Sequence, residues 1–237
     1  MTTPLLPTPC RITGRTDNSA DVFTLDVQPP AADWQFSPGQ FNMLYIPGAG
    51  EVAISISSDP ANKESLQHTI RAVGSVTGLL HSKQADQELC LRGPYGRGWP
   101  VTESAGKDVL IVAGGIGLAP LRPVLYAIIG QRRQFGRVTL VYGARTPADI
   151  LYGEQLLAWK DEGLIDLAVT VDTADADWRG DVGVVTDPLR RVQCAPDNTV
   201  AMVCGPEIMM RFVANVLREL GLPREAIYAS MERSMKC

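Results

Sequence analysis

The feature that most constrains the fold of this chain is a change in its hydrophobic pattern near residue 100. Up to about residue 92, short segments that alternate between apolar and polar residues, or are rich in β-branched residues, are each followed by turn residues. Beyond the polar stretch 103–108, continuous apolar runs alternate with segments of helical length. The chain therefore has to build two different architectures, one after the other.

The first pattern predicts a small antiparallel barrel. Six short strands at this spacing, separated by segments rich in proline, glycine and aspartate, are typical of such a barrel. A short helix is expected at 77–82. The expected strands are 10–16, 21–27, 40–46, 52–57, 66–73 and 88–93.

The second pattern predicts a doubly wound parallel sheet with helices on both of its faces. Its first run, DVLIVAGG at 108–115, is continuously apolar up to its glycines, as a strand buried on both faces requires. The domain boundary is expected near 98–107, which gives a barrel domain at 1–100 and a nucleotide-binding domain at 101–232. The other expected strands are 137–144, 164–172, 199–205 and 226–230, and the expected helices are 118–134, 153–162, 184–192 and 206–220.

Composition excludes several classes of protein. With 22 Lys and Arg against 26 Asp and Glu, the net charge of −4 leaves no broad basic surface for nucleic acid or an anionic membrane. The longest apolar stretch, 109–121, is interrupted by three glycines and a proline, so we expect no membrane span. The opening MTTPLLPTP has no basic region of the signal-peptide kind, which favours a cytoplasmic protein. Five cysteines without a CxxC pair argue against a disulfide framework.

The strongest local motif is AGGIGLAP at 113–120, where the buried strand is expected to turn into a helix. Gly115 and Gly117, beside Gly114, would let the backbone approach a pyrophosphate, whose charge suits the amides of a helix start. The spacing is G-x-G-x-x-P, with Pro120 where the common dinucleotide fingerprint has a third glycine. A glycine-rich turn without any ligand is the alternative interpretation.

A second turn, CGPEIMM at 204–210, follows a later strand and opens a helix. In an open α/β sheet, ligands bind at the carboxyl ends of the strands, so we expect both turns to face one site. In the barrel half, the segments VAISISS at 52–58 and GSVTGLL at 74–80 place hydroxyl groups and helix-start amides together. Alternating serines are equally typical of the solvent face of a strand.

Together these segments resemble the ferredoxin-NADP reductase superfamily of flavoprotein reductases, over essentially the whole chain. Within it, the segments ISIS, VGSVTGLL, RGPYGRGWP, VYGARTPADILY and SMERSMKC are similar to the gamma subunits of multisubunit hydrogenases and sulfhydrogenases, which bind FAD and NAD(P). They are also similar to the electron-transfer subunit of dihydroorotate dehydrogenase and to an anaerobic sulfite reductase subunit. The resemblance implies a six-stranded flavin-binding barrel followed by the nucleotide-binding domain.

The resemblance assigns the flavin site to the barrel. Ser55 matches the serine of the family's R-x-Y-S motif and would lie near flavin N5, whereas Val52 and Ile54 replace the arginine and tyrosine of that motif. FAD is expected, with FMN as the alternative because of this replacement. Arg71 is a candidate substitute cation, or else a solvated strand arginine. The remaining flavin-site candidates are Ile54, Ile56, Ser57, Val73, Gly74 and Thr77, the last two matching a pyrophosphate turn.

The resemblance assigns the nicotinamide dinucleotide to the second domain. Gly114, Gly115, Gly117 and Pro120 match its pyrophosphate turn. The turn beside the nicotinamide is formed by Cys204, Gly205 and Pro206, and Glu232 matches a carboxylate near the flavin. Ser55, Cys204 and Glu232 are the catalytic candidates.

The last residue of the sequence, Cys237, marks a candidate metal ligand. In the gamma subunits, the segment after MKC holds a [2Fe-2S] cluster with four cysteine ligands, and residues 233–237 match the start of that segment. Because a cluster needs four ligands and the other cysteines are scattered, we expect Cys237 to bind metal only if a cluster motif follows it.

The choice of nicotinamide depends on residues after two strands. Asp172 follows the segment LAVTV and is expected to favour the free 2′-hydroxyl of NAD, because a carboxylate repels the 2′-phosphate of NADP. Arg145 acts in the opposite direction or covers the adenine. Asp172 as a simple turn residue is the alternative.

The sequence thus predicts a flavoprotein oxidoreductase subunit. It would pass electrons between NADH or NADPH and iron–sulfur partner subunits through FAD, in a hydrogenase or sulfhydrogenase complex. The electron-transfer subunit of dihydroorotate dehydrogenase or of sulfite reductase is the alternative. A non-catalytic scaffold subunit that binds a nucleotide is the alternative of another class.

Overall fold

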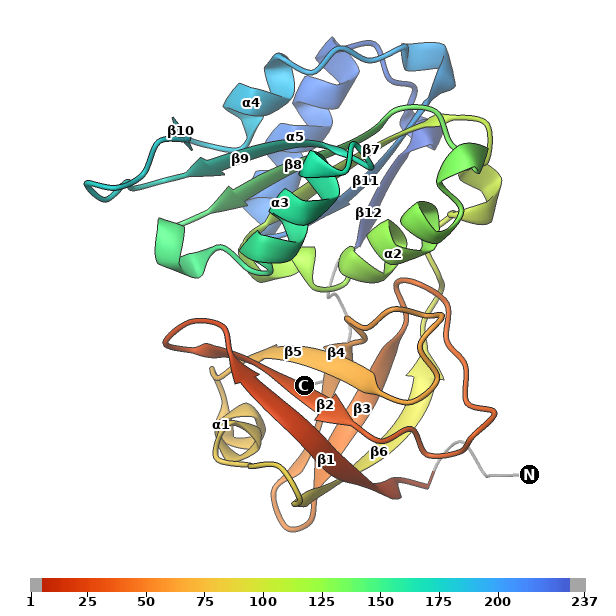
Figure 1. Ribbon diagram of the computed structural model, residues 1–237, viewed down its shortest axis with the longest axis vertical. Helices are drawn as coiled ribbons and strands as arrows, with labels where there is room; N and C mark the ends of the chain where they lie inside the picture. Colours follow the sequence, from red (N-terminus) through yellow and green to blue (C-terminus); the bar gives the residue numbers. More distant parts are fainter. Residues whose placement is uncertain (1–5, 231–237) are drawn as a thin grey trace. The chain divides into compact units, whose positions relative to one another are not determined.

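A computed structural model describes residues 6–230. Within them the chain forms two compact units, drawn in Figure 1. The first unit comprises residues 6–98 together with 122–127, and the second comprises 99–121 together with 128–230. Each unit is described by itself below. Glu232 and Cys237 lie outside the described residues.

The first unit contains the expected six-stranded antiparallel sheet. Its strand order is β4-β3-β6-β1-β2-β5. The two outer strands of this order are linked by the Ser57 N–H, which donates to the Gln67 carbonyl at 2.8 Å. This link joins the segment after β4 to β5, as closure into a barrel requires. The elements are β1 (Thr8–Asp17), β2 (Val22–Val27), β3 (Phe41–Ile46), β4 (Gly50–Ser55), β5 (Leu66–Arg71), α1 (Ser75–His81) and β6 (Glu88–Tyr95).

The barrel core follows from strand alternation. In β3, for example, Asn42, Leu44 and Ile46 are buried while the residues between them are partly exposed. The large side chains that fill the interior include Ile12, Phe23, Leu25, Leu44, Leu66, Ile70, Leu80, Leu89 and Leu91.

The second unit contains the expected parallel sheet, in the order β10-β9-β8-β7-β11-β12. Helices α4 and α5 share one apolar cluster with alternate residues of β7 and β11, and α3 lies on the other side of the sheet in Figure 1. The strands are β7 (Asp108–Gly114), β8 (Val138–Ala144), β9 (Asp166–Val171), β10 (Asp181–Val182), β11 (Thr199–Cys204) and β12 (Ile227–Ser230), and the helices are α3 (Gly153–Asp161), α4 (Thr186–Arg190) and α5 (Glu207–Glu219). Helix α2 (Arg122–Gly130) has its residues 122–127 in the first unit and the rest in the second.

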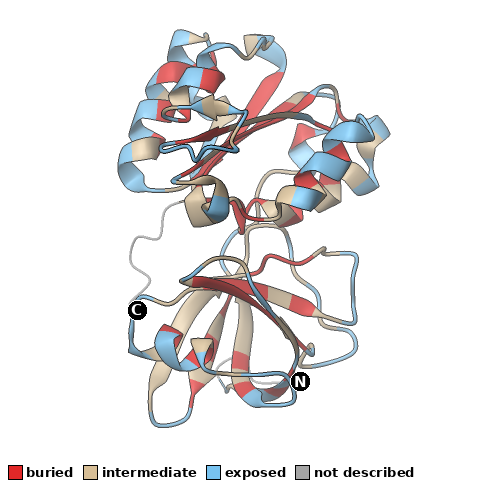
Figure 2. Ribbon diagram, turned by 60° about the vertical axis from the view of Figure 1, so that its left-hand side comes forward, coloured by how far each residue is buried: buried red, intermediate tan, exposed pale blue. Residues whose placement is uncertain are grey.

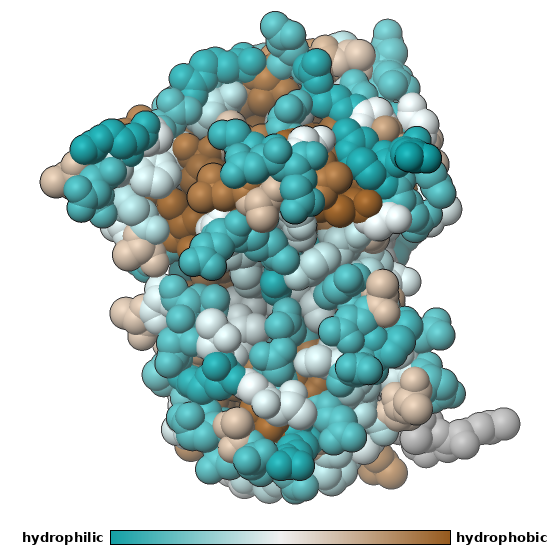
Figure 3. All heavy atoms as spheres, viewed as in Figure 1, coloured by the Kyte–Doolittle hydropathy of each residue, from teal (hydrophilic) through white to brown (hydrophobic). Residues whose placement is uncertain are grey.

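Burial in this sheet matches its two-sided covering. Every residue of β11 is buried, and six of the seven residues of β7 are buried, which Figure 2 shows as red strands. Figure 3 shows one face of the molecule, on which apolar residues of the second unit are visible between hydrophilic ones. Among residues 6–230, no helix has both the length and the apolar character needed to cross a bilayer.

The structure differs from the predicted elements mainly at one helix. Instead of a helix over 118–134, the chain forms a 3₁₀ turn, then α2, then another 3₁₀ turn. Helix α2 starts late because Pro123, in its first turn, suits a helix start and has no N–H to give to the preceding turn. The short strand β10 was not predicted. The 3₁₀ segments are η1 (Thr102–Ser104), η2 (Gly115–Leu118), η3 (Arg132–Gln134), η4 (Pro147–Asp149), η5 (Pro196–Asn198) and η6 (Arg224–Ala226).

Candidate nucleotide and flavin sites

The strand order of the second unit creates a switch point between β7 and β11. From β7 the chain moves to β8, β9 and β10 on one side, and then returns to β11 and β12 on the other. Ligands of such sheets bind at the carboxyl ends of the strands beside this point. Ala113 at the end of β7 is paired with Cys204 at the end of β11, so both strands end at the same level.

The two predicted turns come together at this switch point. A Cβ atom on Gly117, in η2, would lie only 2.5 Å from the Cys204 carbonyl oxygen. A Cβ atom on Gly205 would lie 3.1 Å from the Gly114 nitrogen. The turns after β7 and β11 are therefore in direct contact, although they are far apart in the sequence.

The glycines of the first turn serve different purposes. Gly115 has a φ of +52°, which favours glycine, and a Cβ atom there would have no heavy atom within 4 Å. Gly117 is buried against the Cys204 backbone, so packing inside the protein already requires a glycine there. The expectation that a helix begins directly at this turn is wrong, because Pro120 follows η2 and precedes α2. Gly115 is thus the glycine of this turn that can admit a ligand.

The second turn presents more backbone than side chain. Cys204 is 9% exposed, so its thiol faces largely inward. Pro206 is exposed and precedes α5, and Gly205 lies between them. A role of this turn beside a nicotinamide stays a prediction.

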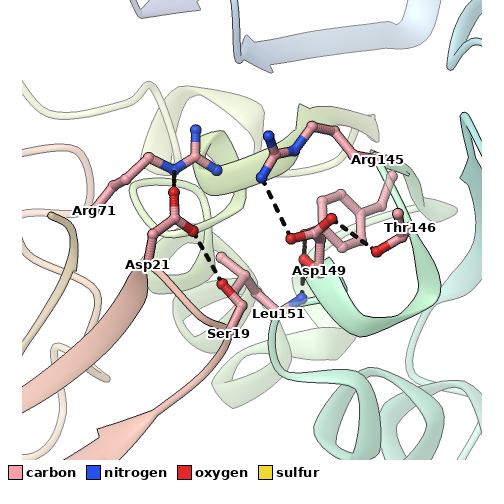
Figure 4. A network of polar contacts seen from close by, with 8 residues as sticks. Ser19, Asp21, Arg71, Arg145, Thr146, Asp149 and Leu151 are labelled. Atoms are coloured by element: carbon pink, nitrogen blue, oxygen red, sulfur yellow. Dashed lines mark hydrogen bonds and ion pairs between the residues drawn. The ribbon is translucent and has the colours of Figure 1, made fainter. Parts of the chain in front are cut away.

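Asp172 and Arg145 follow adjacent strands, β9 and β8. The Asp172 N–H donates to the Ala144 carbonyl at 3.0 Å, while its carboxylate side chain is exposed. Arg145 is 65% exposed and pairs with Asp149 at 3.5 Å. Asp149 also accepts a hydrogen bond from Thr146 Oγ1 at 2.8 Å, as Figure 4 shows. The Arg145 charge is therefore partly balanced, whereas the Asp172 carboxylate points to solvent.

The flavin candidates of the barrel are not equally accessible. Ile54 packs against the barrel core, and Ile56 and Ser57 have no exposed surface. The Ser57 hydroxyl is bonded to Thr69 Oγ1 at 3.0 Å. Ser55 is partly exposed and, by strand alternation, points away from the face that Ile54 buries. Among these four residues, Ser55 offers the side chain that a bound group could reach.

A buried polar pair lies under Ser55, and the sequence analysis missed it. His68 Nδ1–H donates to the Ser55 carbonyl oxygen at 3.1 Å, and Asn42 Nδ2 donates to His68 Nε2 at 3.2 Å. Both side chains have no exposed surface. Burial lowers the pKa of His68 to about 4, although its backbone hydrogen bonds act in the opposite direction. A neutral imidazole therefore holds the end of β4. The sequence feature that could have indicated this buried pair is Asn42, a polar residue at an inward position of the alternating strand β3.

The turn before α1 is held by Thr77. Its Oγ1 accepts hydrogen bonds from the Val73 N–H at 3.0 Å and the Gly74 N–H at 2.8 Å. Val73 itself is 78% exposed. An apolar side chain in this position is available to cover a planar or aliphatic part of a ligand.

Arg71 is paired within the barrel. Its Nε lies 3.3 Å from Asp21 Oδ2, and Ser19 Oγ donates to the other carboxylate oxygen of Asp21 at 3.3 Å (Figure 4). The side chain keeps about a third of its surface exposed, at 34%. It is therefore neither a freely solvated strand arginine nor an unbalanced positive charge, and a phosphate contact would have to share it with Asp21.

The residues present fit a flavin at the barrel and a dinucleotide at the sheet edge. Ser58 Oγ is buried without a hydrogen-bond partner among the described residues, close in sequence to Ser55, and can donate to a bound group. At the sheet edge, Gly115 leaves open space where a pyrophosphate can approach the backbone. Within residues 6–230, no three His, Cys, Asp or Glu side chains cluster as metal ligands would.

A shallow groove of about 520 Å³ lies between α5, η6 and β12. It lies apart from the two turns, and its lining is mainly exposed arginine and aliphatic surface. The lining residues are Arg211, Ala214, Asn215, Arg218, Arg224 and Ile227. The predicted site residues do not line it.

Comparison with known proteins agrees with this geometry. The family model of the oxidoreductase NAD-binding domain matches residues 111–215, which include both turns. The chain is 38% identical over 209 residues to the sulfhydrogenase 1 subunit gamma of Pyrococcus furiosus, covering 87% of this chain and 72% of that protein. It is 32% identical over 231 residues to a probable electron transfer subunit of dihydroorotate dehydrogenase B from Methanocaldococcus jannaschii, covering 98% and 80%.

Solved structures share the fold. A ferredoxin NADP⁺ reductase from Neisseria gonorrhoeae, with bound FAD and NADP, superposes with a TM-score of 0.79 at 20% identity, over 94% of this chain and 98% of that one. The FAD/NAD-binding domain of nitric oxide dioxygenase from Vibrio cholerae gives 0.81 at 18% identity, over 94% and 97%. The chain therefore has the fold of ferredoxin NADP⁺ reductases, belongs to the family that contains the gamma subunits of sulfhydrogenases and the electron-transfer subunits of dihydroorotate dehydrogenase, and acts in redox electron transfer.

Proposed function

We propose that this chain is a flavoprotein subunit that passes electrons between NAD(P)H and iron–sulfur partner subunits through FAD. The observation that carries the proposal is the meeting of the GGIG and CGP turns at the switch point, with Gly115 open beside it. The barrel in the same chain supplies Ser55, Ser58 and the turn at Gly74. The relatives named above, which are subunits of sulfhydrogenase and of dihydroorotate dehydrogenase, support an electron-transfer role within a complex.

FAD would supply the redox chemistry, because a flavin accepts a hydride from a nicotinamide and releases electrons one at a time. The protein would bind and orient the reactants. The backbone at Gly115 would hold the pyrophosphate, and Gly205 with Pro206 would border the nicotinamide. In the barrel, Ser55 would lie beside the reactive edge of the flavin, and His68 would hold the Ser55 carbonyl in place.

The partner is expected to differ between the relatives. The higher identity to the sulfhydrogenase gamma subunit favours a hydrogenase or sulfhydrogenase complex. The nearly complete coverage of this chain by the alignment to the dihydroorotate dehydrogenase subunit keeps that complex as the second candidate. In both, electrons would leave the flavin for iron–sulfur centres of neighbouring subunits.

Anaerobic titration with NADH tests this proposal. We expect the purified protein to be yellow, to release FAD rather than FMN on acid extraction, and to lose its flavin absorbance when NADH is added. A colourless protein that also fails to take up added FAD would overturn the flavin assignment. A yellow protein that NADH and NADPH both leave oxidised would instead support a non-catalytic scaffold subunit.

A further inference from the structure

Met209 lies between the two turns of the second unit. It is the third residue of α5 and is half-buried. A Cβ atom on Gly114 would lie 2.2 Å from Met209 Sδ, and a Cβ atom on Gly205 would lie 2.9 Å from both Sδ and Cε of Met209. The thioether therefore rests against the Cα atoms of both glycines. The next residue, Met210, belongs to the apolar core instead.

The contact of Met209 with both glycines lies just beyond the last paired residues of β7 and β11. The register between β7 and β11 ends with the pair Ala113 and Cys204, so Gly114 and Gly205 are the first residues beyond it. Past this point no strand pairing fixes the distance between the two chain segments. Met209 contacts both of them there, and its side chain is flexible enough to fill an irregular gap.

We propose that Met209 is a positioning residue that sets the spacing of the GGIG and CGP turns, and with it the width of the dinucleotide site. The inference rests on the proposed function, because the ligand is a nicotinamide dinucleotide. It also gives Gly114 and Gly205 a role that differs from that of Gly115. A Cβ atom at either of these glycines would overlap the present position of the Met209 side chain, whereas Gly115 faces open space.

The test is a double-mutant cycle read by calorimetric titration of the FAD-loaded protein with NAD⁺, which measures equilibrium binding without turnover. Met209→Ala should raise the Kd for NAD⁺ at least fivefold, and Met209→Leu should restore most of the loss. Gly114→Ala pushes the Met209 side chain aside and should also raise the Kd about fivefold. In the Met209→Ala background, Gly114→Ala should change the Kd less than twofold, because the clashing side chain has gone.

Gly143→Ala is the matched control. It adds a methyl group to the neighbouring strand β8, where the Cβ atom would lie 3.0 Å from Val185 Cβ rather than near Met209. Its effect on the Kd should be the same in both backgrounds. Flavin content and melting temperature of each variant show that the barrel is intact and the fold retained.

Two results would overturn the inference. One is a Met209→Ala variant that binds NAD⁺ as tightly as the unmodified protein, and the other is an effect of Gly114→Ala that is equal in both backgrounds. In either of these results the unmodified protein still binds NAD⁺, so the inference fails while the proposed function stands. If the unmodified, FAD-loaded protein binds no NAD⁺ at all, the proposed function itself fails, and this inference fails with it.

Discussion

Gly115 combines a left-handed backbone with open space on the side where a side chain would project. Its φ is +52°, and no heavy atom lies within 4 Å of a Cβ atom built there. A second glycine, Gly163, has a φ of +69° and is equally open, but it follows α3. Substitutions at Gly115 and Gly163 can therefore be compared to separate the cost of backbone strain from the loss of a binding surface.

We predict that Gly115→Ala and Gly163→Ala each lower the free energy of unfolding by about 1 kcal/mol, because an L side chain is strained in the left-handed region. Only Gly115→Ala should raise the KM for NADH, since its methyl group would enter the space proposed for the pyrophosphate. Urea unfolding and steady-state kinetics measure the two effects. An equal change of KM in both variants would show that Gly115 is not at the binding surface.

Asp172 offers a second prediction at the scale of one residue. Its exposed carboxylate follows β9, next to the strand that precedes Arg145. Asp172→Ser should improve kcat/KM with NADPH roughly fivefold relative to NADH, because the repulsion of the 2′-phosphate is removed.

Asp175→Ser is the matched control for Asp172→Ser. The Asp175 carboxylate already accepts hydrogen bonds from the Asp177 and Trp178 N–H groups, at 3.1 and 2.9 Å. Its replacement should leave the NADH to NADPH ratio unchanged. An unmodified protein that uses NADPH as well as NADH, or better, would contradict the assignment of Asp172.

At the scale of elements, the end of β4 depends on a polar residue of the neighbouring strand β5. His68 is one of two histidines in the chain and has no exposed surface. Its neutral ring donates to the Ser55 carbonyl and accepts from Asn42. Protonation would remove the acceptor and place a charge in the barrel core, so this strand contact is sensitive to acid.

The pKa of His68 is lowered from 6.5 to about 4 in the folded protein, so the unfolded chain binds the proton more tightly. The stabilisation from the neutral ring is therefore present above the unfolded pKa and is lost as the pH falls towards 4. We predict a loss of about 2 kcal/mol of unfolding free energy from this group between about pH 7 and about pH 5. Urea unfolding of the protein and of His68→Gln measures it.

The His68→Gln variant should lose less stability over the same pH range, although it starts from a lower value. An identical pH dependence in His68→Gln would show that the buried ring does not titrate in this range.

At the scale of the whole molecule, the proposed function gives each of the two units a different cofactor. The barrel would hold the flavin, and the parallel sheet would hold the dinucleotide that reduces it. An electron-transfer subunit of this kind needs acceptors, and the relatives are subunits of sulfhydrogenase and of dihydroorotate dehydrogenase. We therefore predict that the natural protein is part of a larger complex.

Native mass spectrometry of the protein isolated from its own cells, with analysis for iron and nickel, measures this prediction. The expected result is a complex that contains iron–sulfur subunits, and nickel would favour the hydrogenase type. A stable monomer that reduces a soluble organic substrate at full rate with NADH would contradict it.

Much of this organisation could be predicted from the sequence, because hydrophobic periodicity is local. The alternation of Leu44 and Ile46 in β3 predicted a half-buried strand, and the continuous run of β7 predicted a strand covered on both faces. Asn42 occupies an inward position of the same strand, but the sequence could not show that His68 from another strand would meet it. The boundaries of α2 were missed because the glycine-rich turn folds as a separate 3₁₀ segment.

By itself the sequence determined the order of the two architectures and the places of the two glycine turns. The tertiary structure decided that β11 lies next to β7, and so brought Gly117 against the Cys204 carbonyl and Met209 against Gly114. It also decided that Gly115, and not Gly117, faces open space. The physical reason is that periodicity and turn chemistry act between near neighbours in the chain, whereas strand order and the space around a glycine depend on contacts between distant segments.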